Sequence, residues 1–188
     1  MSDTATVSAI MPVYNGAAHC VGSMWSVLRQ SCPPAELIVV DDGSTDGSLA
    51  VMRAALAAEP APTTTVVFLT QVNAGQSAAR NHAASVATGE FLAFIDQDDT
   101  WTPRHMEVLV AQFADRPDVA WAYSDFDELD GDGQAVTHRF LAHHRLAHPK
   151  RALSDMLRED LMILPSASVL RATAFRAVGG FDPDLCGY

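Results

Sequence analysis

The sequence predicts an α/β fold in which a mostly parallel sheet is flanked by helices. Short, almost continuously apolar segments alternate with amphipathic segments through the first hundred residues. Such apolar segments are typical of parallel strands that helices cover on both faces. Several of them end in polar or acidic residues, as expected where the carboxyl ends of parallel strands form a ligand-binding edge. Beyond about residue 101 the pattern changes, so we also expect a small antiparallel portion.

The elements of the first hundred residues follow in order. We expect strands at about 7–11, 36–41, 64–69 and 90–95, and helices at about 17–30, 47–58 and 76–87. Val21, Met24 and Leu28 recur at helical spacing, which predicts one buried face for the first helix. The Ser-Thr-Asp run at 44–46 supplies N-cap candidates for the second helix.

The second half of the chain has a different character. Thr102 and Pro103 predict an N-cap and a first-turn proline for a helix that runs to about Ala114. We then expect a strand at 119–123, a hairpin turn at 130–133, a short helix at 152–157, a strand at 167–170 and a brief helix at 172–178. Residues 137–150 are rich in histidine and arginine but lack the spacing of a helical zinc pair, so we expect a polar loop there.

Size and composition favour a single domain over residues 1–188. The chain has 188 residues, of which 48% are hydrophobic, enough for one substantial core. Its formal net charge of −11 argues against nucleic acid as a partner and against a polybasic membrane anchor. The amino terminus lacks basic residues and no membrane span is visible, so we expect a cytoplasmic protein, with peripheral membrane association left open. Cys20, Cys32 and Cys186 are odd in number and widely spaced, which is typical of reduced thiols.

The most informative stretch runs from Phe91 to Asp99. An apolar segment that predicts a buried strand is followed by three carboxylates within four residues. Because burying an unpaired carboxylate is costly, such a strand normally delivers its charges to a cleft. Alternation along an extended chain places Asp96 and Asp98 on one side, with Asp99 facing away. Two converging carboxylates suit a hard divalent cation that holds a phosphorylated substrate, although such pairs also occur solvated or as helix caps.

Three polar clusters follow expected strands, and we expect them to meet in one crevice because the carboxyl ends of parallel strands share an edge. They are residues 12–15, 41–42 and 96–98. Residues 41–47 have an alternative interpretation as a turn and helix cap. The segment 73–77, followed by Arg80, is either a loop that starts a helix or a close backbone approach to a diphosphate that Arg80 faces.

Taken in order, these clusters closely resemble those of the family 2 glycosyltransferases, which have the GT-A fold, a Rossmann-like α/β fold. The matching segments are residues 8–15, 36–46, 73–75 with 79–81, 89–99 and 178–182. The resemblance implies one GT-A domain over residues 1–188. About residues 1–100 would form its nucleotide-sugar-binding half, and about residues 101–188 would form part of its acceptor-side half.

The resemblance implies a donor site for a nucleoside-diphosphate sugar, which we expect to be a UDP-sugar. The members of this site would be Pro12, Tyr14, Asn15, Asp41, Asp42, Asn73, Gly75, Arg80, Asp96 and Gln97. Pro12 and Tyr14 would line the base and ribose pocket. Asp42, supported by Asp41, would accept a hydrogen bond from the uracil ring, and Arg80 would lie near the diphosphate.

A divalent cation is also implied by the resemblance. Asp96 would contact the ribose or sugar side of the donor and would form the metal site together with Asp98, which would ligate Mg²⁺ or Mn²⁺. The cation would neutralise the charge that builds on the departing nucleoside diphosphate. The family's reaction is inverting transfer to an acceptor hydroxyl, here on a saccharide, a lipid-linked or another acceptor. We expect residues 137–166 to determine acceptor specificity.

The general base of such a transfer would belong to an acidic pair shortly after the segment 179–182. The chain ends at Tyr188, so we expect the base beyond that residue and leave the catalytic residue unassigned. From these 188 residues we therefore expect donor binding with weak or absent transfer.

Two other functions stay open. A nucleotidyltransferase builds similar acidic metal sites, but it would carry basic residues in a glycine-rich loop after the first strand, where residues 14–18 contain no Lys or Arg. A nucleotide-sugar-binding module without catalysis is favoured by the expected position of the base, whereas Arg80, Asp96 and Asp98 favour an enzyme. The oligomeric state is left open.

Overall fold

The structure is a computed structural model that describes residues 6–145 and 163–185. The strands of its main sheet are β1 (Val7–Val13), β2 (Glu36–Asp41), β3 (Thr65–Thr70), β4 (Phe91–Phe94), β5 (Trp121–Tyr123) and β8 (Ser168–Arg171). A hairpin of β6 (Glu128–Leu129) and β7 (Ala135–Thr137) stands apart from this sheet. The helices are α1 (Cys20–Leu28), α2 (Ser48–Ala58), α3 (Gln76–Val86), α4 (His105–Val110), α5 (Phe140–His143) and α7 (Ala172–Ala177), with 3₁₀ turns η1 (Ala111–Phe113) and η2 (Pro165–Ala167).

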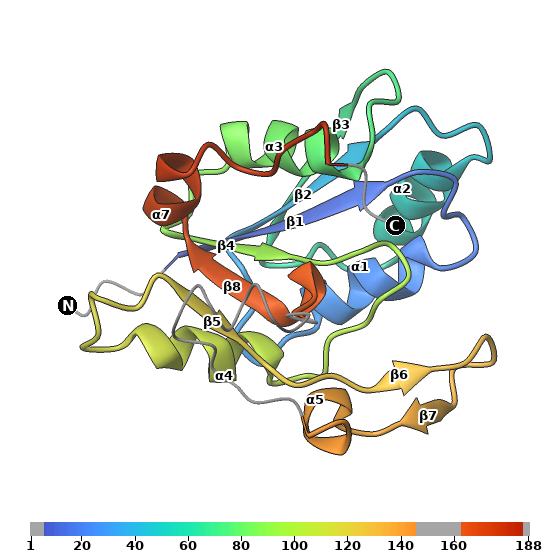
Figure 1. The fold of residues 1–188 in the computed structure, drawn as a ribbon. Coiled ribbons are helices and arrows are strands. Elements are labelled where there is room, and N and C mark those ends of the chain that lie inside the picture. The colour runs from blue at the N-terminus through green and yellow to red at the C-terminus, as the bar shows by residue number, and fades with distance from the viewer. Residues whose placement is uncertain (1–5, 146–162, 186–188) are drawn as a thin grey trace.

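The six strands lie in the order β3-β2-β1-β4-β8-β5 (Figure 1). Strands β1 to β4 pair in parallel, while β8 runs antiparallel to both β4 and β5. The mostly parallel α/β sheet with a small antiparallel portion is therefore confirmed. The helix predicted at 152–157 lies outside the described residues.

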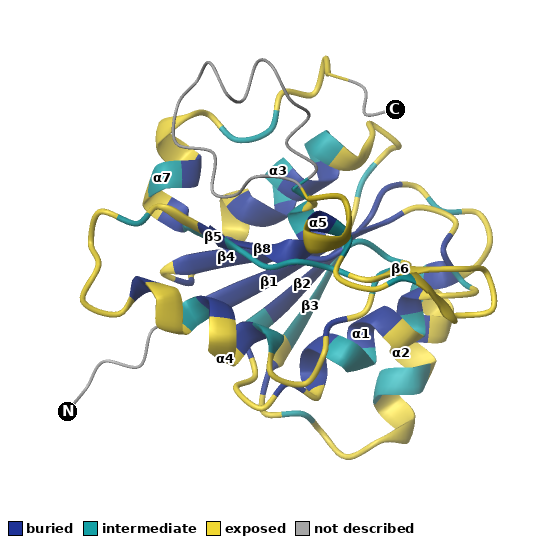
Figure 2. Cartoon of the chain, turned by 60° about the horizontal axis from the view of Figure 1, so that its bottom comes forward, coloured by how far each residue is buried: buried dark blue, intermediate teal, exposed yellow. Residues whose placement is uncertain are grey.

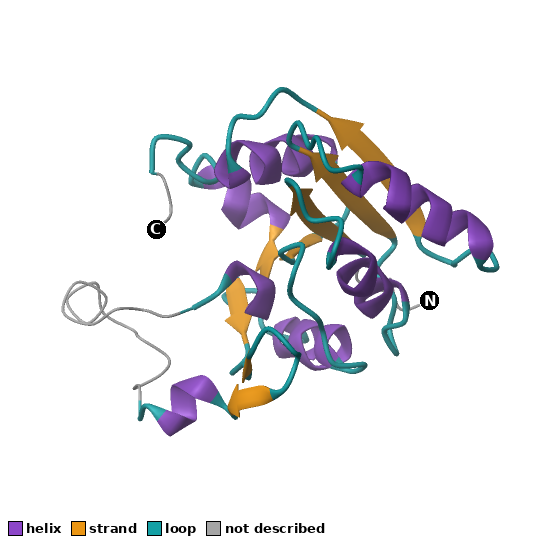
Figure 3. Ribbon diagram, turned by 90° about the vertical axis from the view of Figure 1, so that its right-hand side faces the viewer, coloured by secondary structure: helices purple, strands orange, loops and turns teal. Residues whose placement is uncertain are grey.

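Helices cover both faces of the sheet (Figure 3). One face packs on α1, α2 and α4 through alternate strand residues such as Met11, Val39 and Ala93. The intervening residues, such as Ile10 and Phe94, pack on α3 and α7. The central strands are buried while the outer helix surfaces are exposed (Figure 2), which explains why these strands read as continuous apolar runs.

Strand β1 continues through Pro12, beyond the end predicted from the sequence. The carbonyl of Ile10 accepts a hydrogen bond from Ile95 on the β4 side, and Pro12 faces that same side. Because β4 ends at Phe94, the missing amide hydrogen of Pro12 leaves the pairing with β2 intact.

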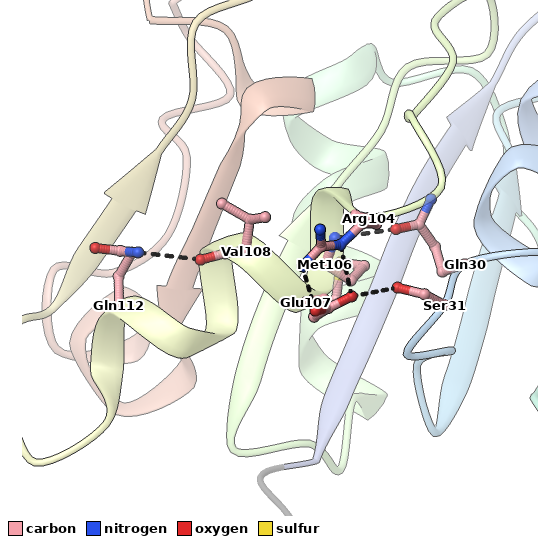
Figure 4. A network of polar contacts seen from close by, with 7 residues as sticks. All are labelled: Gln30, Ser31, Arg104, Met106, Glu107, Val108 and Gln112. Atoms are coloured by element: carbon pink, nitrogen blue, oxygen red, sulfur yellow. Dashed lines mark hydrogen bonds and ion pairs between the residues drawn. The ribbon is translucent and has the colours of Figure 1, made fainter.

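Helix α4 begins at His105, two residues later than Pro103 predicted. The carbonyl of Pro103 accepts a hydrogen bond from Ser31 at 2.7 Å instead of continuing a helix. The first turn of α4 is then satisfied by Gln30, whose Oε1 accepts the free amide hydrogen of Met106 at 3.0 Å (Figure 4). Arg104 and Ser31 both donate to Glu107 on the outer side of this turn.

The loop between β4 and α4 is held along its length by α1 and the residues after it. Ser23 donates to the carbonyl of Gln97 at 2.7 Å, and Ser26 accepts the amide hydrogen of Trp101 at 3.1 Å. Gln30 donates to the carbonyl of Thr102 at 2.7 Å. The acidic loop is thus fixed by three polar side chains from one neighbouring segment.

The opposite, amino-terminal end of the sheet has its own polar cluster. The carboxylate of Glu36 accepts hydrogen bonds from the Ser8 hydroxyl at 2.6 Å and from the amide and hydroxyl of Thr88. Gly89 donates to the Ser8 hydroxyl at 2.8 Å. These contacts join the starts of β1 and β2 to the turn before β4.

In the described part of the chain, no helix is both long enough and apolar enough to span a bilayer.

Candidate functional site

A pocket of about 300 Å³ lies at the carboxyl ends of β1, β2 and β4. Its lining residues are Pro12, Val13, Tyr14, Asp42, Gln76, Asp96, Gln97 and Asp98. The three polar clusters that the sequence places at strand ends are therefore brought around one pocket. Gln76 is the first residue of α3, so the amino end of that helix also faces the pocket.

Asp42 organises the loop between β3 and α3. Its buried carboxylate accepts hydrogen bonds from Gln71 Nε2 at 2.8 Å and from the amides of Ala74 and Gly75, both at 2.9 Å. A carboxylate has about four acceptor positions, so three are used within the protein. The exposed Asn73 lies in the same loop, next to the residues that Asp42 holds.

The loop after β1 is joined to the loop after β2 by side-chain contacts. The side-chain oxygen of Asn15 accepts a hydrogen bond from the backbone amide of Thr45 at 2.8 Å, and the backbone amide of Asn15 donates to the Ser44 hydroxyl. Asp41 accepts the amide of Ser44 at 2.9 Å. Asn15 and Asp41 therefore brace the loops, and neither lines the pocket.

The start of α2 belongs to the same network. Gly47, with φ of 84°, occupies the N-cap position, but Asp46 supplies the acceptor for the amide of Ser48 at 2.9 Å. Asp46 also accepts the amide of Ala17, and the Ser48 hydroxyl accepts the amide of Gly16 at 2.8 Å. Of the N-cap candidates at 44–46, Asp46 thus bonds the first helical amide.

Gln97 fixes the backbone of Tyr14 at the edge of the pocket. Its Oε1 accepts the Tyr14 amide at 2.8 Å, and its Nε2 donates to the Tyr14 carbonyl at 3.1 Å. A Cβ atom on Gly16 would overlap the Gln97 amide, so any other residue at that position would displace this amide. The half-exposed Tyr14, whose backbone is fixed in this way, lines the same pocket as Asp42 and Asp98.

Arg80 reaches the site through Asp96. The two side chains form an ion pair, and Arg80 is 4% exposed. Its guanidinium carbon lies 5.3 Å from the ring centre of Phe181, and within the described residues its Nε has no hydrogen-bond partner. In this structure Arg80 pairs with Asp96 and is not among the residues that line the pocket, and its expected place near a diphosphate stays a prediction.

Asp99 is directed to a different partner from Asp98. Burial raises the pKa of the Asp99 carboxyl, and the nearby charges of Asp96 and Asp98 raise it further, while the Ser166 hydroxyl opposes the shift. Ser166 also accepts the amide of Asp96 at 2.9 Å, and its carbonyl accepts Trp101 Nε1 at 2.7 Å. Asp99 is therefore not among the residues that line the pocket, but its carboxyl is close enough to interact electrostatically with the carboxylates of Asp96 and Asp98.

The acidic pair fits a cation that shares its coordination with a ligand. Among the described residues, no group of three or more His, Cys, Asp or Glu side chains is arranged to hold a metal ion. Mg²⁺ at a nucleotide site typically uses one or two carboxylates together with phosphate and water oxygens. The exposed Asp98 satisfies this requirement, whereas Asp96 is already paired with Arg80.

The protein-family model described as "Glycosyl transferase family 2" matches residues 8–179 of the chain. The chain belongs to glycosyl transferase family 2. The family assignment suggested by the ordered motifs is thus confirmed.

Curated relatives of this family 2 chain are longer than it is. The uncharacterized glycosyltransferase YibD of Escherichia coli K12 is 39% identical over 127 residues, which cover 67% of this chain and 36% of YibD. The glycosyltransferase GlyG of Streptococcus pneumoniae serotype 4 is 29% identical over 181 residues, which cover 92% of this chain and 58% of GlyG.

Solved structures share the fold of this family 2 chain. Residues 1–349 of Staphylococcus aureus TarS superpose with a TM-score of 0.71 at 22% identity, covering 97% of this chain and 52% of that one. The mannosyltransferase PcManGT of Pyrobaculum calidifontis, in complex with GDP-Man and Mn²⁺, gives a TM-score of 0.70 at 21% identity, covering 97% and 49%. At these identities the likeness establishes the GT-A fold.

Three residues around the pocket were not singled out by sequence reasoning. Gly16 is recognisable only once its contact with Gln97 is known, and Ser166 approaches from a segment 70 residues after Asp96. Gln76 had a usable signal, because it directly follows Gly75 at the start of a predicted helix.

Proposed function

We propose that this chain binds a UDP-sugar in the pocket and that the protein transfers the sugar, with inversion, to an acceptor hydroxyl. The observation that carries the proposal is the meeting of Asp42, Asp96 and Asp98, from the ends of two different strands, around one pocket in a family 2 chain. Family membership supports this function over nucleotidyl transfer.

The nucleoside would occupy the part of the pocket formed by Pro12, Tyr14 and Asp42. The fourth acceptor position of the Asp42 carboxylate is free to receive the N–H of a uracil ring. Asp41, Asn15, Asn73 and Gly75 would act indirectly, since they shape the loops on either side of Asp42.

The diphosphate would lie between the amino end of α3 and Asp98. Partial positive charge at a helix amino terminus favours a phosphate group near Gln76. Asp98 would ligate Mg²⁺ or Mn²⁺, with Asp96 beside it, and the bound cation would stabilise charge on the leaving nucleoside diphosphate. PcManGT in complex with GDP-Man and Mn²⁺ and TarS in complex with UDP and UDP-GlcNAc share this fold, which supports the proposal that the chain binds a nucleotide sugar together with a divalent cation.

The acceptor would be a saccharide, a lipid-linked or another hydroxyl compound. It would approach from the side of the hairpin β6–β7 and α5, which extend beyond the main sheet (Figure 1). We assign the general base to none of the described residues.

Calorimetric titration of UDP in the presence of Mn²⁺, and again with EDTA, tests the donor site. The parent chain should bind UDP with Mn²⁺ and lose more than about tenfold in affinity with EDTA. Asp98→Asn should bind UDP equally weakly in both conditions. Asp132→Asn, an equal change of charge at an exposed position of the hairpin turn, should behave as the parent. Absence of binding heat for the parent with metal present would refute the donor site.

A panel of nucleotide sugars then identifies the donor. Ligands that bind only the native state raise its melting temperature, so the cognate donor should give the largest increase and should require Mn²⁺. Equal increases with UDP- and GDP-sugars would contradict the role given to Asp42.

A further inference from the structure

Asn81 connects α3 to a segment one hundred residues further along the chain. Its Nδ2 donates to the carbonyl of Phe181 at 2.7 Å, and its Oδ1 accepts the amide of Phe181 at 2.9 Å. One side-chain amide thus satisfies both backbone polar groups of a single residue. This pairing fixes the position and the orientation of Phe181 relative to α3.

Gly180 is required by the same contact. A Cβ atom at position 180 would lie 2.5 Å from Asn81 Oδ1, and the residue has φ of 81°. Gly179 also has positive φ, at 85°, so the two glycines turn the chain from α7 back onto α3. The glycine pair therefore delivers Phe181 to Asn81.

The ring of Phe181 lies against residues that place Asp96. It contacts the ring of Phe94 edge-on at a centroid distance of 5.2 Å, and Phe94 is the last residue of β4, two positions before Asp96. The guanidinium of Arg80 lies over the face of the Phe181 ring, with its carbon 5.3 Å from the ring centre. Arg80 is held by this ring on one side and by the Asp96 carboxylate at one end, while its buried Nε has no partner in the described part of the chain. The direction of the guanidinium therefore depends on the ring.

We propose that Asn81 and Phe181 are positioning residues that hold Arg80 on Asp96 and so fix the Asp96 carboxylate at the edge of the donor pocket. The consequence for ligand binding rests on the proposed function of that pocket. The energetic coupling of Phe181 to Asp96 through Arg80 is independent of that function, and it can be measured without a ligand.

A second arginine stacked on an aromatic ring serves as a control for this arrangement. The guanidinium of Arg171 lies 5.3 Å from the ring centre of Phe113 and pairs with Glu90 at 2.9 Å, on the other face of the sheet. The same guanidinium also lies 5.1 Å from the ring centre of Phe91. Phe113→Leu therefore removes a buried ring and a cation–π contact of the same length, but none of its partners lines the pocket.

The test compares Phe181→Leu and Phe113→Leu, each in the parent and in Asp96→Asn. With UDP and Mn²⁺ as the probe, Phe181→Leu should weaken binding about fivefold in the parent and should add less than twofold in Asp96→Asn. Phe113→Leu should change binding less than twofold in either background, although it lowers the melting temperature. Asn81→Ala should weaken binding in the same direction as Phe181→Leu, and the double variant should be no worse than the poorer single one.

The same four combinations are compared by urea unfolding without ligand. Phe181→Leu and Asp96→Asn should be non-additive, since both act through Arg80, and Phe113→Leu and Asp96→Asn should be additive. Equal weakening of UDP binding by the two leucine variants, or additivity of Phe181→Leu with Asp96→Asn in unfolding, would overturn the proposal. If the parent fails to bind UDP, the proposed function fails, and the unfolding comparison still decides whether Phe181 acts through Arg80.

Discussion

The side-chain amide of Gln97 pairs with the backbone of Tyr14 through two hydrogen bonds, of 2.8 and 3.1 Å. Gln97 stands between Asp96 and Asp98, two of the three aspartates that line the pocket, and Tyr14 follows the end of β1. The amide therefore fixes the spacing between the acidic loop and the loop after β1. One acceptor position and one N–H of this amide are used by Tyr14, so Gln97 supports the pocket wall, and its direct contact with a donor stays a prediction.

Replacing Gln97 should weaken nucleotide binding more than it weakens the fold. Gln97→Leu removes both hydrogen bonds, but the Tyr14 backbone is exposed enough for water to replace them. The loss of two net hydrogen bonds corresponds to about tenfold weaker UDP binding. Gln97→Glu keeps the acceptor for the Tyr14 amide and should give an intermediate affinity by calorimetry. Two variants with parental affinity would show that the pairing is irrelevant to the pocket.

Adding a methyl group at Gly16 should reproduce the effect of losing Gln97. A Cβ atom there would displace the Gln97 side chain, so Gly16→Ala should weaken UDP binding to a similar degree as Gln97→Leu. The two changes combined should be no worse than either alone. Gly22→Ala is the control, because a Cβ atom at this helical position meets open space and should stabilise α1 by about 0.5–1 kcal/mol.

Asp42 should contribute to stability as well as to binding. Asp42→Ala leaves the amides of Ala74 and Gly75 without their acceptor, which should cost about 2–4 kcal/mol in the free energy of unfolding measured with urea. Hydrogen exchange should increase at both amides. If exchange there is unchanged, Asp42 does not hold this loop in solution.

The buried His105 should make the fold less stable in mild acid, because its imidazole is protonated more readily in the unfolded chain than in the folded one. Burial lowers the pKa of this imidazole to about 4, and its ring stacks on Trp101 at a centroid distance of 4.8 Å. The unfolded chain takes up the proton near pH 6.5 and the folded chain only near pH 4, so stability falls as the pH decreases between these values. Between pH 7 and pH 5 the loss should be about 2 kcal/mol. His105→Phe should abolish this loss in urea unfolding, whereas a change at the exposed His143 should preserve it.

Glu36 should also make the stability of the fold depend on pH, but at lower pH than His105 and because its ionised form is the one that the fold stabilises. Burial tends to raise the pKa of its carboxyl, but hydrogen bonds from Ser8 and Thr88 outweigh burial and lower the pKa below its ordinary value of 4.5. Its contribution is therefore present above about pH 4.5 and is lost as the pH falls through the folded-state value. Glu36→Gln should cost roughly 1–2 kcal/mol at pH 7 and should flatten the decline in stability below pH 4.5. A variant with the parental acid profile would contradict this account.

The sequence predicted the elements that local patterns determine. Strand β2 has the predicted bounds, Glu36–Asp41, because an apolar run there is closed by Asp42 and Gly43. The start of α4 could not be predicted in the same way, since Ser31 takes the Pro103 carbonyl through a contact between distant segments. Local propensity favoured Pro103 as the first helical residue, and a tertiary hydrogen bond decided otherwise.

For the site, the sequence predicted which residues gather but not what each of them contacts. The strand ends carrying Asp42, Asp96 and Asp98 meet because parallel strands share an edge. The pairing of Arg80 with Asp96 depends on how α3 lies against β4 and Phe181, which no spacing in the sequence reveals. The alternation expected of an extended chain does not apply at 96–99, because β4 ends at Phe94 and the amide of Asp99 donates to the carbonyl of Asp96 in a turn, so that Gln97 lines the pocket together with Asp96 and Asp98. The contact of Asp99 with Ser166 comes from a segment far along the chain.

The three polar side chains that grip the acidic loop, from Ser23, Ser26 and Gln30, have a consequence for affinity. A loop that carries ligand-binding carboxylates without regular structure of its own would ordinarily lose conformational freedom when a ligand arrives. Here that entropy is lost when the chain folds, so a nucleotide meets carboxylates that are already in place. Substitutions of these three residues would then weaken nucleotide binding, because the loop would lose its conformational freedom only when the nucleotide arrives.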